Sequence, residues 1–155
     1  MAQEIERKFL IHKKLWDNLQ KPAPVLIEQN YIFNAKPLTL RTRIKGNKGY
    51  ITLKKGKGIT RLEYEYEIPI SDAKELMMID SSSTPIEKKR YSIDYKGKTW
   101  EVDVFLGLNK GLIIAEIELN DENEPFEIPI WIDKEVSSIS KYLNSNLQNK
   151  PFNQW

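Results

Sequence analysis

Charged side chains recur at every second position of this sequence, in pairs of like sign. Six such pairs stand out: Glu4/Glu6, Arg41/Arg43, Glu63/Glu65, Lys88/Arg90, Glu101/Asp103 and Glu116/Glu118. In a β-strand, residues i and i+2 project from one face, so each pair would present two like charges side by side. Carboxylates suit a hard cation such as Mg²⁺ or Mn²⁺, and rows of Arg and Lys suit phosphate oxygens. The pattern indicates a site for a divalent cation together with a polyphosphate.

The amino-acid composition argues against several other kinds of active site and partner. The 155 residues include no cysteine and a single histidine, His12, which argues against thiolate ligands, a His-rich metal site and a Ser-His triad. A formal net charge of only +2 argues against a surface built to hold nucleic acid. No stretch approaches the roughly 18 apolar residues of a membrane span. We therefore expect a cytoplasmic protein whose partner is a small molecule, with neither nucleic acid nor membrane bound.

The elements that must position these charges have a period of two residues. Strands are expected over residues 2–11, 25–34, 38–46, 49–55, 62–70, 86–95, 99–106 and 111–119. Gly-containing links at 46–49, 96–98 and 107–111 have the length of hairpin loops, so the sheet should be largely antiparallel. We expect a mainly β chain of the α+β class, folded as a single domain over residues 1–155.

Helices are the minority in this prediction. Asp72 is expected to cap a helix, with Glu75 three residues later, and Ser137 or Ser138 to cap a last helix. That helix would place Ile139, Tyr142, Leu143 and Leu147 on one face. A short helix is expected over 13–19, and residues 151–155 should form a loosely held tail. The tryptophans Trp16, Trp100 and Trp131 are expected to pack outside the sheet, under the helices.

The distribution of sign along the chain distinguishes two readings of the sheet. An ordinary antiparallel sheet with one face in water also explains alternating charges. However, residues 36–61 hold nine Lys or Arg and no acid, whereas residues 101–127 hold eight acids and one cation, Lys110. A solvated face gains from mixed signs, because like charges on one strand repel. Eight strands can close into a barrel, which would turn the ionic faces inward. We therefore predict a closed eight-stranded barrel enclosing a charged tunnel.

The charges expected inside nearly balance. They comprise seven acids (Glu4, Glu6, Glu63, Glu65, Asp103, Glu116 and Glu118) and six cations (Lys8, Arg41, Arg43, Lys54, Lys88 and Arg90). One net negative charge would not attract a polyanion strongly. Two divalent cations would raise the total to about +3 and roughly match a triphosphate. We therefore expect obligate dependence on Mg²⁺ or Mn²⁺.

The residues quoted so far resemble a known family. Residues 4–10 read EIERKFL, a form of the ExExK signature of the CYTH domain, whose members are the triphosphate tunnel metalloenzymes. Seven further blocks follow in the family's order, at 29–32, 40–43, 52–54, 61–65, 87–91, 102–105 and 115–118. The family includes class IV adenylyl cyclases, thiamine triphosphatases and small bacterial tripolyphosphatases, and the chain is most similar to the last group.

The resemblance implies a role for each site residue. Metal would be held, directly or through water, by Glu4, Glu6, Glu116 and Glu118, with Asp103 as a further acidic contributor. Phosphate oxygens would be held by Arg41, Arg43, Lys54, Lys88 and Arg90. Lys8 and Tyr31 resemble the Lys/Tyr dyad beside the terminal phosphoryl group, although a strand tyrosine is also commonly a core residue. Glu63 and Glu65 are expected to orient the basic residues or the water. A lowered pKa would let Lys8 handle the proton of that water.

The function implied is metal-dependent hydrolysis of a linear triphosphate, such as inorganic tripolyphosphate. An adenylyl cyclase, a thiamine triphosphatase and a non-catalytic polyphosphate- or nucleotide-binding module are the alternatives, and a homodimer is compatible with each. The last helix departs from the family, because residues 136–144 keep Tyr142 and Asn144 but lack an expected acid. The segment from Lys55 to Gly58 could cradle a phosphate, or could simply be a flexible hairpin connection.

Overall fold

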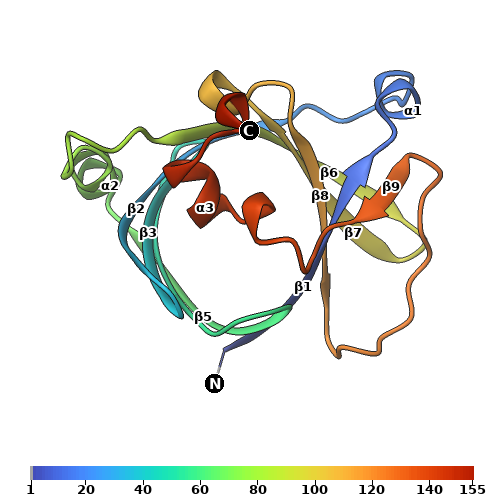
Figure 1. Cartoon of the computed structure of the whole chain (residues 1–155), viewed down its shortest axis with the longest axis horizontal. Helices are drawn as coiled ribbons and strands as arrows, with labels where there is room; N and C mark the ends of the chain where they lie inside the picture. Colours follow the sequence, from blue (N-terminus) through green and yellow to red (C-terminus); the bar gives the residue numbers. More distant parts are fainter. Residues whose placement is uncertain (1) are drawn as a thin grey trace.

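The computed structural model describes residues 2–155, and these form one sheet of nine strands. The strands are β1 (Gln3–Ile11), β2 (Val25–Ala35), β3 (Leu38–Lys45), β4 (Lys48–Lys55), β5 (Thr60–Ile68), β6 (Ile86–Tyr95), β7 (Lys98–Phe105), β8 (Ile113–Leu119) and β9 (Ile132–Glu135). Their hydrogen-bonded order is β5-β4-β3-β2-β6-β7-β8-β1-β9, and β5 also pairs with β1. This last pairing closes β1 to β8 into a ring (Figure 1). The predicted closed antiparallel barrel of eight strands is confirmed.

The strand registers bring the alternating charges face to face. Lys8 pairs with Glu116 and Glu6 with Glu118 across β1 and β8. Lys54 pairs with Glu63 across β4 and β5. Directly paired residues on neighbouring strands point to the same side of the sheet. The barrel thus collects side chains from strands that are far apart in the sequence onto one inner surface.

Strand β1 has two partners along one of its edges. Its first residues pair with β5 through Gln3, Glu4 and Ile5. Further along, Phe9 and Ile11 pair with β9. The sequence analysis missed β9, because Ile132–Glu135 is only four residues long and has no apolar alternation. The barrel seam between β1 and β5 is therefore short, and β9 takes over the same edge beyond it.

Three short α-helices occur within residues 2–155: α1 (Lys13–Asp17), α2 (Ile70–Met77) and α3 (Asn144–Asn149). Helix α2 begins one residue after Pro69, so Asp72 lies in its first turn and the predicted Asp72 cap is wrong. The predicted caps Ser137 and Ser138 are also wrong. The Ser137 hydroxyl instead accepts a hydrogen bond from the backbone N–H of Lys8 at 2.9 Å, and α3 begins later. None of these helices is both long and apolar enough to cross a membrane.

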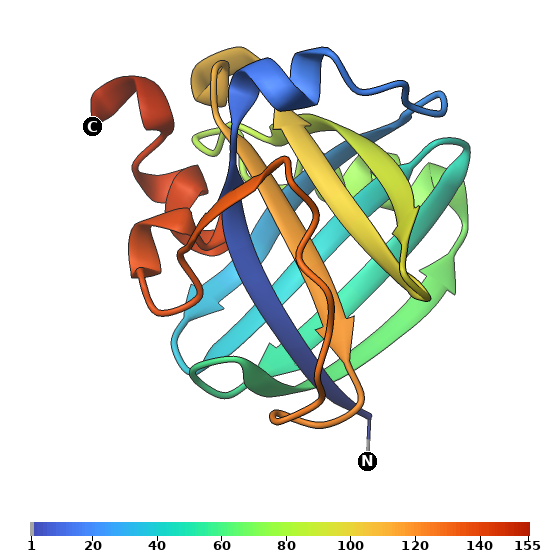
Figure 2. The same ribbon diagram turned by 90° about the vertical axis from the view of Figure 1, so that its right-hand side faces the viewer.

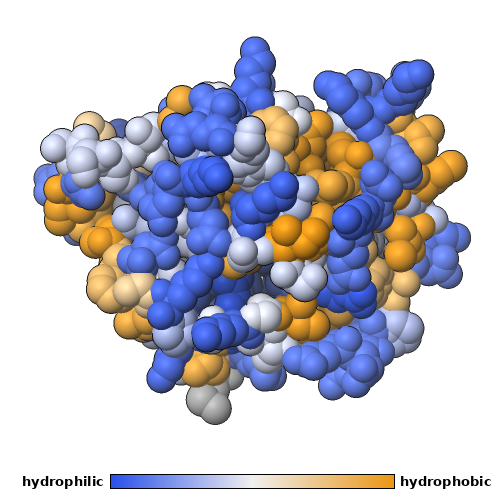
Figure 3. Space-filling view, in the orientation of Figure 1, coloured by the Kyte–Doolittle hydropathy of each residue, from blue (hydrophilic) through white to orange (hydrophobic). Residues whose placement is uncertain are grey.

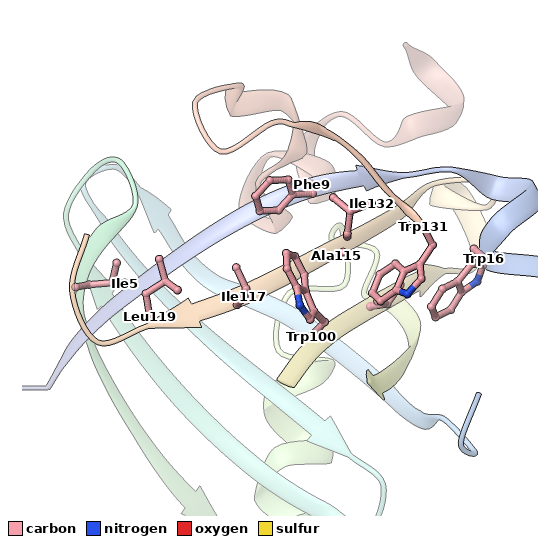
Figure 4. Close-up of a cluster of buried hydrophobic side chains, with 10 residues drawn as sticks. Ile5, Phe9, Trp16, Trp100, Ala115, Ile117, Leu119, Trp131 and Ile132 are labelled. Carbon is pink, nitrogen blue, oxygen red and sulfur yellow. The ribbon is translucent and has the colours of Figure 1, made fainter. Parts of the chain in front are cut away.

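The main hydrophobic cluster lies outside the barrel wall, where β9 and the connection before it cover β1, β7 and β8 (Figure 4). Trp100 packs edge-to-face against Phe9 and Trp131, with ring centroids 5.4 and 6.1 Å apart, and Trp131 packs in the same way against Trp16. The expectation that these tryptophans pack outside the barrel is confirmed, with α1 and β9 as the cover. The barrel interior carries mainly polar groups, apart from apolar residues beneath the C-terminal segment.

The C-terminal segment covers one mouth of the barrel, where two 3₁₀ turns, Ser140–Tyr142 and Phe152–Gln154, flank α3 (Figures 1 and 2). Leu147 of α3 is fully buried in a second cluster with Phe105 and Ile114. The backbone N–H of Phe152 donates to Asn109 Oδ1 at 2.8 Å, and the Trp155 ring packs edge-to-face on Phe152. These contacts contradict the expectation of a loosely held tail over residues 151–155.

Candidate active site

The barrel encloses a cavity of about 230 Å³. Thirteen of the fourteen predicted site residues line it, and Asp103 is the one that does not. The thirteen are Glu4, Glu6, Lys8, Tyr31, Arg41, Arg43, Lys54, Glu63, Glu65, Lys88, Arg90, Glu116 and Glu118. The mouth covered by the C-terminal segment is mostly hydrophilic at its surface (Figure 3). The cavity is thus a polar chamber whose walls carry both signs of charge.

Lys8 lies between two carboxylates on the cavity wall. Its Nζ is 2.6 Å from Glu116 Oε1 and 3.0 Å from Glu6 Oε1. Burial alone would lower the pKa of Lys8, but Glu116 and Glu6 outweigh it and raise that pKa above its usual value. The expected lowered pKa of Lys8 is therefore wrong, because its nearest neighbours are acids and not the cations of β3 and β6. The two acidic neighbours therefore favour the protonated, positively charged form of Lys8.

Glu4 and Glu63 share one cation. Lys54 Nζ is 2.9 Å from Glu4 Oε2 and 3.0 Å from Glu63 Oε2, and Arg61 Nη2 lies 3.7 Å from Glu4. Glu65 accepts a hydrogen bond from the Thr52 hydroxyl at 2.8 Å. Glu63 and Glu65 thus contact basic or hydroxyl groups of the wall, as an orienting role requires.

Asp103 points to the inner side of the barrel like its strand partner Arg90, but it is fully buried and does not line the cavity. Its Oδ2 accepts from Lys88 Nζ at 2.7 Å, and its two oxygens accept from Arg90 Nε and Nη2 at 2.7 and 2.8 Å. Burial opposes its ionisation, but Arg90 and Lys88 lower the pKa of Asp103 to about 2. The structure therefore differs from the expectation of a metal contact, because both oxygens are already used to hold two cations in place.

Lys88 is fully buried among both acidic and basic groups. Burial, opposed by Asp103 and reinforced by Arg90 and Arg43, lowers the pKa of Lys88 to about 7. Its Nζ also donates to Asn144 Oδ1 at 3.0 Å. A nearby anion would favour the protonated form, so the side chain is suited to hold a phosphate oxygen.

Arg41 and Arg43 have no close carboxylate partner. Arg41 Nη2 donates to the Thr52 hydroxyl at 3.3 Å and lies 3.7 Å from Glu65 Oε2. The buried Nε of Arg41 has no hydrogen-bond partner among the described residues. Arg43 donates through Nε and Nη2 to the neutral Gln29 Oε1, at 3.0 and 2.8 Å. Burial, Arg41 and Arg90 lower the pKa of Arg43 to about 10. Both guanidinium groups line the cavity, so an anion placed there would supply the missing acceptor.

Several other carboxylates lie near Glu118 and act on its charge. Burial raises the pKa of Glu118, and Glu4, Glu63, Glu6 and Glu101 raise it further. Within residues 2–155 no three acidic side chains form a ready-made metal site, because Lys8 and Lys54 hold several of them. Carboxylate oxygens are nevertheless the ligands that Mg²⁺ and Mn²⁺ prefer, so the donor set fits such an ion.

The structure adds wall residues that the sequence analysis did not assign to the site: Lys45, Arg61, Glu101, Gln29 and Asn144. Lys45 and Arg61 could have been found, because each lies two residues from a predicted member of its own strand. Gln29 is neutral and fully buried, and charge patterns do not indicate it. It donates to Asn144 Oδ1 at 3.1 Å and so connects Arg43 to the C-terminal segment.

The fold and the charged tunnel together define a CYTH-domain protein. The model of this family, described as the CYTH domain, matches residues 2–150, and the chain belongs to it. The resemblance described from the sequence is confirmed.

Two curated relatives carry the name inorganic triphosphatase. The protein from Acetivibrio thermocellus is 48% identical over 153 residues, covering 98% of this chain and 97% of its own length. The protein from Nitrosomonas europaea is 32% identical over 148 residues, covering 93% and 95%. A crystal structure of an inorganic triphosphatase matches with a TM-score of 0.65 at 30% identity, covering 96% of this chain and 95% of that one.

Proposed function

We propose that this chain hydrolyses inorganic triphosphate inside the tunnel. Water attacks a terminal phosphorus, the bond to the bridging oxygen breaks, and orthophosphate and pyrophosphate leave as a proton is released from the water. The observation that carries this proposal is the pair Arg41 and Arg43, buried on the cavity wall. Arg43 has no ion-pair partner among the described residues, and Arg41 has only the longer contact to Glu65, at 3.7 Å. The names of the two curated relatives support the same substrate.

The basic residues would divide the work between holding the substrate and stabilising charge. Phosphate oxygens would be held by five cations of the cavity wall: Arg41, Arg43, Lys54, Lys88 and Arg90. Phosphoryl transfer depends mainly on positioning and on neutralising the charge of the equatorial and leaving oxygens. Protonated Lys8 would stabilise charge on the terminal phosphoryl group, with Tyr31 on the same cavity wall. Asp103 would act by positioning Lys88 and Arg90.

A divalent cation fits the acidic part of the wall. Glu4, Glu6, Glu116 and Glu118 would hold it, and Mg²⁺ or Mn²⁺ is the ion we propose. When bound, the ion would neutralise phosphate oxygens and fix their orientation. The repulsion that raises the pKa of Glu118 would be relieved by such a charge.

The test is a product-release assay with tripolyphosphate, ATP and thiamine triphosphate, each with Mg²⁺, with Mn²⁺ and with EDTA. We expect orthophosphate and pyrophosphate from tripolyphosphate, and loss of turnover in EDTA. Arg43→Gln should lower turnover strongly, whereas Arg7→Gln, which changes an outward-facing residue of β1 paired with Glu135, should not. Cyclic AMP from ATP would identify a cyclase instead, and binding without any product would identify a non-catalytic module.

A further inference from the structure

A second cavity of about 250 Å³ opens beside the tunnel, at the end covered by the C-terminal segment. Thr39, Lys54, Arg61, Leu143 and Ser145 line both cavities. The two spaces are therefore contiguous along this part of the wall. We call the second space the side cleft.

The side cleft differs from the tunnel in its charge. Lys36 and Lys57 line it in addition to the two shared cations, and none of the described residues that line it carries a carboxylate. Lys54 and Arg61 contact Glu4, but neither Lys36 nor Lys57 has an ion-pair partner within residues 2–155. Lys36 Nζ donates only to the neutral Asn146 Oδ1, at 2.9 Å. Two positive charges in the cleft are thus left without a counter-charge.

The remaining wall offers hydrogen-bond donors in place of acids. Ser138 and Ser140 line the cleft with Ser137, whose hydroxyl already donates to Glu135 at 2.8 Å. Gly58 has φ +76° and open space where a Cβ would lie, so the backbone there is accessible. Hydroxyls, lysines and exposed backbone are the groups that bind phosphate in proteins. Burial and the neighbouring Arg61 also lower the pKa of Lys36, and an anion would reverse that effect.

We propose that the side cleft binds a phosphate group outside the tunnel, either the fourth unit of a linear polyphosphate or free orthophosphate. The proposal rests on the triphosphatase function proposed above, since the tunnel would hold the first three units. It gives a role to Gly56, Lys57 and Gly58 of the segment Lys55 to Gly58, which the function itself does not use.

The test compares tetrapolyphosphate with tripolyphosphate as substrates. Lys57→Glu is expected to lower kcat/KM for tetrapolyphosphate about tenfold more than for tripolyphosphate, because it removes a charge-assisted contact to the fourth phosphate. Lys55→Glu is the matched control, since it makes the same charge change on the same hairpin but on the outer face of β4. Lys57→Arg should retain the wild-type ratio.

The second measurement is the affinity for orthophosphate alone, determined by calorimetry. Weaker orthophosphate binding in Lys57→Glu and Lys36→Ala, with an unchanged substrate ratio, would assign free phosphate to the cleft. No change in either measurement would overturn the proposal. If the wild type released no phosphate from tripolyphosphate, the proposed function would fail, and the affinities for tetrapolyphosphate and tripolyphosphate in the same variants would still test the cleft.

Discussion

Lys8 combines a raised pKa with a position on the tunnel wall, between Glu6 and Glu116. A charge that stabilises the transition state more than the bound substrate affects kcat more than KM. We expect Lys8→Ala to lower kcat by about 10² to 10³ with little change in KM. Steady-state phosphate release measures both, with Lys89→Ala on the outer face of β6 as the control. A rise in KM at constant kcat would make Lys8 a substrate-binding residue.

Much of the site could be predicted at the level of residues, because charge alternation along a strand identifies its inner face. Asp103 shows the limit of this reasoning. Its position in the pattern matches that of a metal ligand, but only the three-dimensional contacts reveal that Lys88 and Arg90 occupy its oxygens. Gln29 shows a second limit, since a neutral side chain gives no charge signal although it holds Arg43.

Helix α2 packs on the barrel through a close contact at Gly49 of β4. A Cβ at this position would lie 2.6 Å from the Cβ of Ala73. We expect Gly49→Ala to lower the free energy of unfolding by about 1 to 3 kcal/mol, as overpacking does. Urea unfolding measures it, and Ala73→Gly in the same chain should recover part of the loss. An unchanged stability in Gly49→Ala would mean that α2 shifts freely on the barrel.

The elements were predictable where the pattern was long and regular. Each barrel strand was expected within about two residues of its observed ends, because seven or more alternating residues give a clear period. Strand β9 was not predictable, because Ile132–Glu135 is short. The C-terminal turns were not predictable either, because residues 137–143 are held by tertiary contacts such as that of Ser137 with Lys8.

The whole molecule encloses nearly equal numbers of acids and cations, so it should be sensitive to acid. Despite burial, Lys8 and Lys54 lower the pKa of Glu6 to about 2, and Arg90 and Lys88 do the same for Asp103. Both groups bind fewer protons in the folded state than in the unfolded state below about pH 4.5, so their stabilisation is lost as the pH falls toward 2.

We expect the free energy of unfolding to fall by about 5 kcal/mol between pH 5 and pH 2, as measured by urea unfolding. Asp103→Asn should be less stable at pH 7 but should change less over this range. Equal stability of the wild type at pH 5 and pH 2 would contradict the prediction.

The hydrophobic cluster outside the barrel has a consequence for how the chain can vary. In β1 and β8 the even-numbered residues Glu4, Glu6, Glu116 and Glu118 face the tunnel, whereas odd-numbered neighbours such as Ile5 and Ile117 pack in the cluster. Natural selection on the reaction and selection on folding therefore act on alternate positions of the same strands. New specificities can evolve at the even-numbered positions of these strands while the odd-numbered positions preserve the scaffold.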